Sequence, residues 1–230
     1  MNLILFEWKL IVRNKRLRQL FVVSALLLPL MFYIQLADST LLKECFVIKE
    51  CFLWAIFTLP ANFATLAFSI NASFIEKQVI APLSIFKILQ AKYRLYCITS
   101  GVLFILFLPS LFLGIKLMQL VAAFLFSVGF AFGGLFYSSL FSYKPFNIKA
   151  SYFANYQGFD AGNYFFPMLM VIVALGLLSL FYWFFNEIIT LTAMSLTGLV
   201  FIATNRIWLG KIGKNFEKSK YHRLECFREK

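Results

Sequence analysis

The chain has 230 residues, of which 61% are hydrophobic and 14% are charged, with a formal net charge of +12 and a mean hydropathy of +0.81. Soluble domains average roughly 45 to 50% apolar and about 25% charged residues. At roughly 20 residues per membrane-spanning helix, the apolar runs hold about six spans and leave no room for a soluble catalytic domain. Composition therefore excludes most enzymes and predicts an all-α, polytopic membrane protein.

Residues 1–18, which from position 2 read NLILFEWKLIVRNKRLR, are too charged to cross a bilayer. Lys9, Arg13 and Arg16 recur at i, i+4 and i+7, a spacing that places them on one face of a helix. Trp8 is typical of side chains that lie at the level of the lipid headgroups. We expect a cytoplasmic amphipathic helix on the membrane surface. The alternative is a positively charged segment that only fixes the orientation of the first span.

The transmembrane domain is expected at residues 19–208, followed by a basic cytoplasmic tail at residues 209–230. The domain contains six apolar windows, each long enough to cross a bilayer as a helix. These windows lie at about residues 20–36, 51–70, 95–115, 117–141, 164–185 and 188–208.

Lysine and arginine residues are distributed unevenly between the two sides of the predicted topology. With the N-terminus inside, only Lys43, Lys49 and Lys116 of the 22 basic residues lie outside. Because cytoplasmic loops carry an excess of Lys and Arg, both termini are predicted to be cytoplasmic, in a bacterial inner membrane. The same charge predicts membrane lipids as partners and argues against nucleic acid.

The segment FIEKQVIAPLSIFKILQAKYRLY, residues 74–96, separates the second and third windows and is rich in charge. A charged residue costs roughly 2.5 to 3.5 kcal/mol at the centre of a membrane helix, so the segment belongs on the cytoplasmic side. Its apolar residues Val79, Ile80 and Leu83 are expected to form a small exposed docking element, since a few anchors suffice for such binding. An ordinary solvated loop is the alternative. The predicted docking residues are Glu76, Lys77, Gln78, Val79, Ile80, Ala81, Pro82, Leu83 and Ser84.

Residue patterns for catalysis or cofactor binding are not found in the sequence. There is no phosphate-binding loop of the form G-x-x-x-x-G-K-[ST], and His222 is the only histidine. We therefore expect no catalytic, cofactor or metal site in this chain. Cys45 and Cys51 lie on the predicted outer side, which leaves a disulfide there open.

Ionisable residues inside membrane spans usually mark ion or proton pathways. Here Glu7, Glu76 and Glu187 all lie at the edges of the predicted spans. This placement argues against an ion-coupled carrier and against a channel lined by charge.

The sequence FEWKLIVRNKRLRQL before the first span, the six spans, and IEKQVIAPLSIFKILQAKY between spans two and three resemble the type-2 ATP-binding-cassette (ABC) permeases. In that family an acidic residue, a short knob, a turn containing proline and a helix containing lysine follow span two. Glu76, Pro82, Leu83-Ser84-Ile85 and Ala91-Lys92-Tyr93 occupy those places. The resemblance implies that Glu76–Ser84 is a coupling helix that docks in a separate ATPase subunit, which binds ATP and Mg²⁺.

The stretch SYFANYQGFDAGNYFFP, residues 151–167, is also similar to a branch of larger permeases in this group. The chain looks like one half of those relatives, which implies pairing with itself or with a related permease. It departs from the family in one place, because only Asn186 and Glu187 separate the last two windows. The family usually carries a re-entrant outer hairpin there.

Two functions follow from these observations. The first is the membrane subunit of an ABC exporter, without enzymatic activity of its own and with a substrate that the sequence does not indicate. The second is a membrane scaffold, assembly factor or sensor that holds a cytoplasmic partner without transport, since fold does not settle function. A stand-alone channel or carrier has the least support.

Overall fold

The computed structural model describes residues 3–27, 29–31, 33–34, 46–58, 64–65, 67–68, 84–141 and 161–228. All regular structure in these ranges is helical, which confirms the predicted all-α class for this part of the chain. The α-helices are α1 (Leu3–Arg13), α2 (Lys15–Val22), α5 (Phe46–Thr58), α7 (Ile85–Phe107), α8 (Leu117–Phe126), α9 (Phe132–Ser138), α10 (Ala161–Phe184), α11 (Glu187–Ala203) and α12 (Asn205–Arg228). The other elements are the π-helices η1 (Val23–Leu27) and η5 (Ser127–Ala131) and the 3₁₀-helices η4 (Leu108–Leu113) and η6 (Ser139–Phe141).

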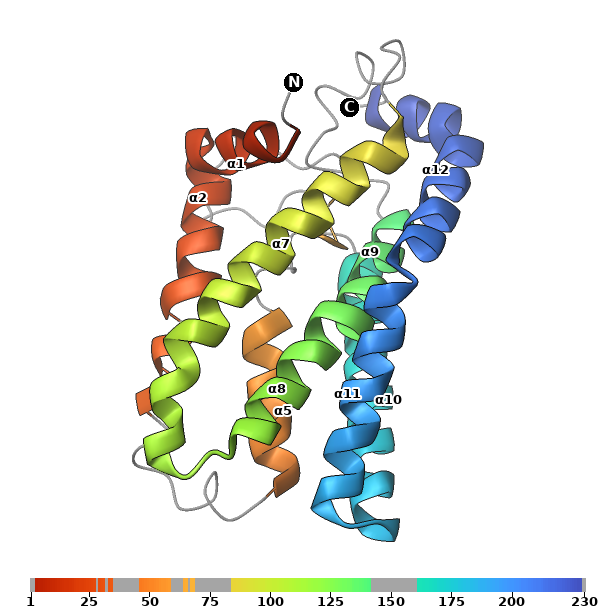
Figure 1. The fold of residues 1–230 in the computed structure, drawn as a ribbon. Helices are drawn as coiled ribbons and strands as arrows, with labels where there is room; N and C mark the ends of the chain where they lie inside the picture. The colour runs from red at the N-terminus through yellow and green to blue at the C-terminus, as the bar shows by residue number, and fades with distance from the viewer. Residues whose placement is uncertain are drawn as a thin grey trace.

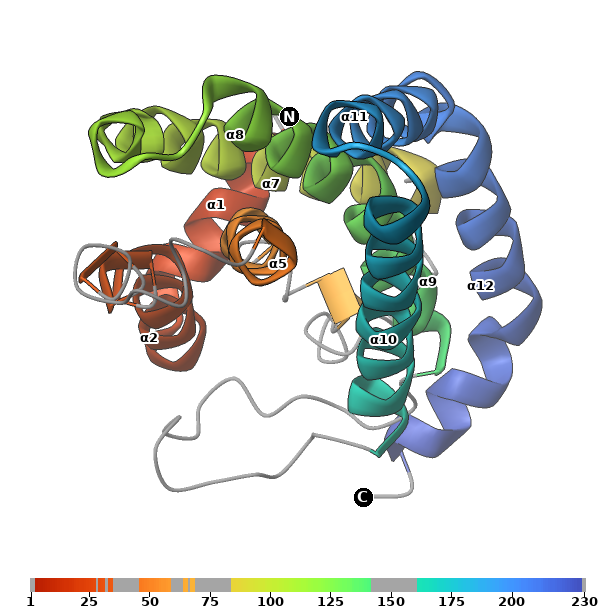
Figure 2. The same cartoon turned by 90° about the horizontal axis from the view of Figure 1, so that it is seen from below.

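Most helices run along the long axis of the molecule, and α1 lies across one end, called here the upper end (Figure 1). Helix α12 lies at the same end. Figure 2 shows α5 on the inner side of α7 and α8, between α2 and α10. Its position fits its side chains, because Leu53, Trp54, Ile56 and Phe57 of α5 are all buried.

Two helical runs within the described residues are long and apolar enough to cross a membrane, Ile85–Leu113 and Leu117–Phe141. A third is added if the bent pair Glu187–Ala203 and Asn205–His222 forms one span. Within α10, Ile172–Phe184 is a shorter apolar helix. These helices are fewer than the six predicted spans, and two of the predicted windows, at 20–36 and 51–70, lie partly outside the described residues.

The predicted surface helix is divided at Asn14, where α1 ends and α2 turns down along the bundle (Figure 1). The side-chain amide of Asn14 donates a hydrogen bond of 2.6 Å to the carbonyl of Leu10. Asparagine favours helix ends because its side chain competes with the backbone for such bonds. The element that crosses the upper end is therefore Leu3–Arg13, and Arg16 and Arg18 belong to the descending helix α2.

The predicted basic tail forms most of helix α12, which is bent by 59° from α11 at Thr204. Leu209, Ile212 and Phe216 of α12 are buried in the main hydrophobic cluster. Their spacing of i, i+3 and i+7 is that of one face of a helix. The sequence interpretation did not include this apolar face among the many lysines, whereas residues 209–228 are helical and pack on the bundle through it.

Helix backbones approach closely where α11 meets the end of α8 and η5. A Cβ atom added to Gly129 would overlap the backbone of Gly198, and one added to Gly198 would overlap the carbonyl of Leu125. Small residues allow such close packing between membrane helices. Glycine at these two positions is therefore required by the space between the helices.

We predict that Gly129→Ala lowers the free energy of unfolding by about 1 to 3 kcal/mol, the usual cost of overpacking. The thermal unfolding temperature of the detergent-solubilised protein measures this change. The matched control is Gly176→Ala in α10, where an added Cβ meets no atom within 4 Å. Equal stability of the two variants would contradict the close packing.

Candidate functional site at the junction of α1 and α7

Of the predicted docking segment Glu76–Ser84, only Ser84 lies within the described residues. Ser84 is exposed, has an extended backbone and occupies the N-cap position of α7. Its carbonyl accepts hydrogen bonds from the backbone N–H groups of Lys87 (3.0 Å) and Ile88 (3.4 Å). The segment therefore leads directly into α7, with no further linker.

A buried ion pair joins the first turns of α7 to α1. The Lys92 ammonium donates a hydrogen bond of 2.7 Å to Oε2 of Glu7. The Lys92 and Glu7 side chains are only 3% and 5% exposed. Two buried charges cost several kcal/mol of desolvation, which their attraction offsets only while both are present. The pair therefore fixes the position of α1 relative to α7.

Tyr93, beside the ion pair on α7, makes contacts with three other elements. Its ring packs edge-on against Trp208 of α12 and Phe132 of α9, with ring centroids 5.4 Å and 6.2 Å apart. Its hydroxyl donates a hydrogen bond of 3.3 Å to the carbonyl of Val128 in η5. Edge-to-face pairs are worth roughly 0.5 to 1.5 kcal/mol beyond the area they bury. The start of α7 is thus packed against α12, α9 and η5 as well as bonded to α1.

The predicted surface-helix residues that the structure describes lie on the outside of α1. Trp8, Lys9 and Arg13 are exposed, whereas Glu7 and Leu10 face the protein. The Trp8 ring meets Phe21 of α2 edge-on, with centroids 5.7 Å apart. The Arg16 side chain lies outside the described part of the structure. One face of α1 is therefore bound to the protein, and its opposite face is available to headgroups and water.

Sequence reasoning did not find the ion pair, because it treated Glu7 only as a charge at the edge of a span and Lys92 only as a cytoplasmic charge and the lysine of the family motif. Two signals point to it. Glu7 is the only acidic residue before Asp38, in a segment otherwise rich in Lys and Arg. Lys92 lies at helical spacing from Leu89 and Tyr96 and so belongs to the apolar face of α7. A lysine on an apolar face requires an acidic partner.

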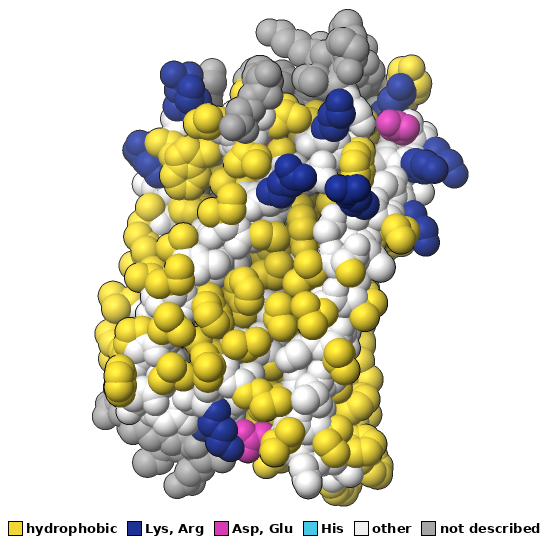
Figure 3. Space-filling view, in the orientation of Figure 1, with side chains coloured by type: hydrophobic (Ala, Val, Ile, Leu, Met, Phe, Trp, Pro, Cys, Tyr) yellow, Lys and Arg dark blue, Asp and Glu magenta, His cyan; other side chains and the backbone are white. Residues whose placement is uncertain are grey.

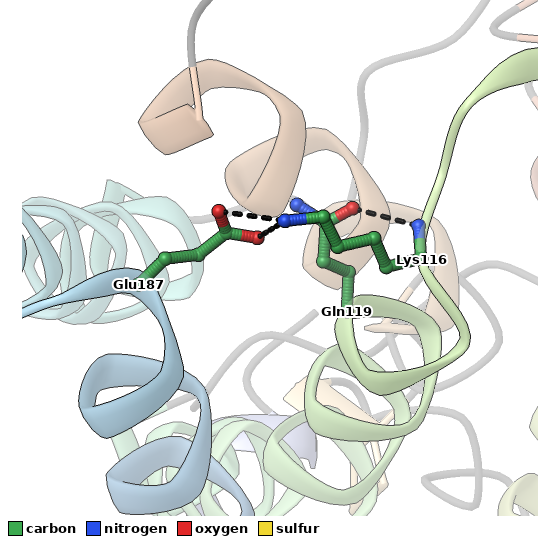
Figure 4. A network of polar contacts seen from close by, with 3 residues as sticks. All are labelled: Lys116, Gln119 and Glu187. Atoms are coloured by element: carbon green, nitrogen blue, oxygen red, sulfur yellow. Dashed lines mark hydrogen bonds and ion pairs between the residues drawn. The ribbon is translucent and has the colours of Figure 1, made fainter.

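A second polar contact, at the opposite end, joins the first turns of α8 and α11 (Figure 4). The Lys116 ammonium donates to both carboxylate oxygens of Glu187, at 2.9 Å and 3.0 Å. The backbone N–H of Lys116 donates to Oε1 of Gln119 at 2.9 Å. The Lys116 side chain is 66% exposed, so this pair contributes far less than the buried one.

Glu50, in the first turns of α5 just before the second predicted span, is a buried acidic group. It is fully buried, and neither carboxyl oxygen has a hydrogen-bond partner among the described residues. The pKa of Glu50 is raised to about 8, mainly by burial and to a smaller extent by the charge of Glu187, with the charge of Lys49 acting in the opposite direction. The carboxyl group is therefore mainly protonated at neutral pH.

The family DUF5687, described as a family of unknown function, matches residues 2–230 of the chain. No curated protein and no solved structure matches the chain. Any function has to be inferred from the residues of this chain.

We predict that Lys92→Met lowers the free energy of unfolding by about 3 to 5 kcal/mol, because it leaves the Glu7 carboxylate buried without its partner. Combining Glu7→Leu with Lys92→Met should restore most of this loss, since it removes both buried charges. Thermal unfolding in detergent measures both changes. The control is Lys116→Met in the exposed pair, which should cost about 1 kcal/mol or less. A double variant no more stable than Lys92→Met would show that attraction between the charges is not what fixes α1.

The raised pKa of Glu50 predicts a dependence of stability on pH. The folded protein holds the Glu50 proton more tightly than the unfolded chain, so stability falls as pH rises from the ordinary value of 4.5 to about 8. In Glu50→Gln this part of the fall should disappear, which unfolding temperatures at about pH 5 and about pH 9 would reveal.

The control for Glu50 is Glu217→Gln, at an exposed position on α12, which should keep the pH dependence of the original protein. If Glu50→Gln keeps it too, Glu50 is already ionised in the folded protein at neutral pH.

Proposed function

Because the chain belongs to the DUF5687 family, whose function is unknown, we propose its function from its own residues: it is the membrane-spanning permease subunit of an ABC exporter. A separate ATPase subunit binds ATP and Mg²⁺ and docks at residues 76–84. The chain crosses a bacterial inner membrane six times with both termini in the cytoplasm. It pairs with a second copy or with a related permease.

The surface of the molecule supports this placement in a membrane. Lys and Arg side chains gather at the upper end, and the middle of the visible face is mainly apolar (Figure 3). Large apolar side chains on α7 and α10 are exposed to the surroundings, as expected for contact with lipid, and they include Ile98, Val102, Ile105, Leu106, Ile172 and Leu177. Helices α1 and α12 both lie at the basic end, which agrees with two cytoplasmic termini (Figure 1).

The observation that carries the proposal is that residues 76–84 lead directly into α7, whose first turns are packed firmly against α1 and α12. Helix α7 begins at Ile85 and continues as an α-helix to Phe107. Its first turns are fixed to α1 by the Glu7–Lys92 pair and to α12 by the contact between Tyr93 and Trp208. A partner that moves residues 76–84 would move this packed unit as a whole. Rigid-body movement of packed helices is how ATPase closure reaches a membrane domain.

The connection between α10 and α11, at the proposed outer end, is short. Only Phe185 and Asn186 lie between the two helices, so the outer hairpin usual in type-2 ABC permeases does not fit here. Lys116 and Glu187 instead join α8 to α11 at that end. In the export cycle this exposed pair is the contact that separates when the outer side opens, because an exposed pair breaks at little cost.

Replacing residues 79–83 by a Gly-Ser sequence of the same length tests the docking site. We predict that an ATPase encoded beside this chain co-purifies with the unaltered protein and is lost from the variant, because the apolar anchors are removed. The matched control replaces residues 40–44, on the predicted outer side, and should keep the ATPase.

An ATPase that remains bound after the replacement of residues 79–83 would rule out this docking site. A partner that binds there and shows no ATP hydrolysis in reconstituted vesicles would favour the scaffold or sensor function instead of export.

A further inference from the structure

A long apolar groove is lined by residues of α7, α2, η1 and α1. Figure 1 shows α2 beside α7, with α1 across their upper ends. The upper part of the groove has a volume of about 650 Å³ and is lined by α1, α2, η1 and α7. A second hollow of about 380 Å³ shares Leu26, Leu103 and Leu106 with the first and reaches Tyr33 and Phe107. Because the two hollows share these three residues, they adjoin along α7 and are treated as one groove, and each is of a size that proteins use for small ligands.

The length of the groove along α7 is about the thickness of the hydrocarbon part of one bilayer leaflet. Along α7 it extends from Leu95 to Phe107, which at 1.5 Å per residue is about 18 Å. Half of a hydrocarbon core of about 30 Å is about 15 Å. A helix from a second protein copy would cross both leaflets and would need a groove about twice as long.

One positive charge marks the upper end of the groove. Arg18 is the only charged residue among the described side chains that line either hollow, and it forms no ion pair with any other described residue. Arginine offers five N–H donors that match the oxygens of a phosphate group. Trp8, which lines the same end and is 41% exposed, is of the type enriched at the headgroup level.

We propose that this groove binds an anionic phospholipid of the cytoplasmic leaflet, with one acyl chain along α7 and the phosphate group at Arg18. The apolar lining below Arg18 holds the acyl chain apart from the surrounding lipids, and the guanidinium binds the phosphate of the headgroup. The exposed residues Arg13 and Lys15 at the same end add to the positive potential, which favours a headgroup with net negative charge. The proposal rests on the membrane placement given above and is independent of an ATPase partner.

The test uses the full-length protein, transferred from detergent into a mixture of phosphatidylglycerol and phosphatidylcholine with identical acyl chains. Native mass spectrometry then counts the lipids of each kind that remain bound. We expect the unaltered protein to retain one phosphatidylglycerol in preference to phosphatidylcholine. Arg18→Gln should lower this preference about tenfold, the effect of losing a charge-assisted contact of about 1.4 kcal/mol. Arg206→Gln, which removes an exposed arginine at the start of α12, should leave it unchanged.

A second pair of variants tests the groove itself. Val102→Trp and Ile98→Trp place an indole in the groove at positions that are 52% and 58% exposed, so both variants are expected to fold. Both should lose the retained lipid, whereas Leu180→Trp at a similarly exposed position on α10 should keep it.

Three results would overturn the proposal. The first is an unchanged lipid preference in Arg18→Gln, and the second is retained lipid in both tryptophan variants of the groove. The third is a dimer of the unaltered protein that dissociates in Val102→Trp but not in Leu180→Trp, which would assign the groove to a second copy. Loss of the ATPase partner has no bearing on these measurements, so the export function and the lipid site fail independently.

Discussion

The upper end of this molecule depends on one interaction, the buried contact between the carboxylate of Glu7 and the ammonium of Lys92. A short amphipathic helix such as α1 gains little from its own backbone hydrogen bonds and needs tertiary contacts to hold its position. An ion pair shielded from water gives it a specific one, because neither charge has another partner of opposite sign among the described residues. The position of α1 in turn determines the upper lining of the groove beside α7 and where the exposed residues Lys9 and Arg13 lie.

The rest of the bundle is held by a different kind of contact. Gly129 and Gly198 allow the backbones of η5 and α11 to come into direct contact. Close packing of this kind holds helices together in lipid, where the hydrophobic effect does not drive apolar helices to associate. Rings of phenylalanine, tyrosine and tryptophan fill the space around α7 and connect it to α12. Charge thus places the surface helix, and shape places the spanning helices.

Much of the helical content could be predicted from the sequence, and much of the site could not. Continuous apolar runs predict spans at 95–115 and 117–141, because a bilayer demands length and apolarity of any single helix. The helical runs Ile85–Leu113 and Leu117–Phe141 cover most of these windows, although the first begins ten residues earlier than its window. The Glu7–Lys92 pair joins residues 85 positions apart, and no local periodicity reports such a contact. The bend at Thr204 is equally hidden, since α11 and the start of α12 lie inside one apolar window, 188–208. The role of Glu76–Ser84 stays a prediction, because most of that segment lies outside the described residues.

The distance in sequence between Glu7 and Lys92 also sets an order of events during synthesis. A chain made from its N-terminus presents the Glu7 carboxylate long before the ribosome reaches Lys92, 85 residues later. Until then Glu7 lacks this partner, and α1 can make only its contacts with neighbouring α2, such as that between Trp8 and Phe21. The ion pair that fixes α1 therefore cannot form before α7 has been synthesised.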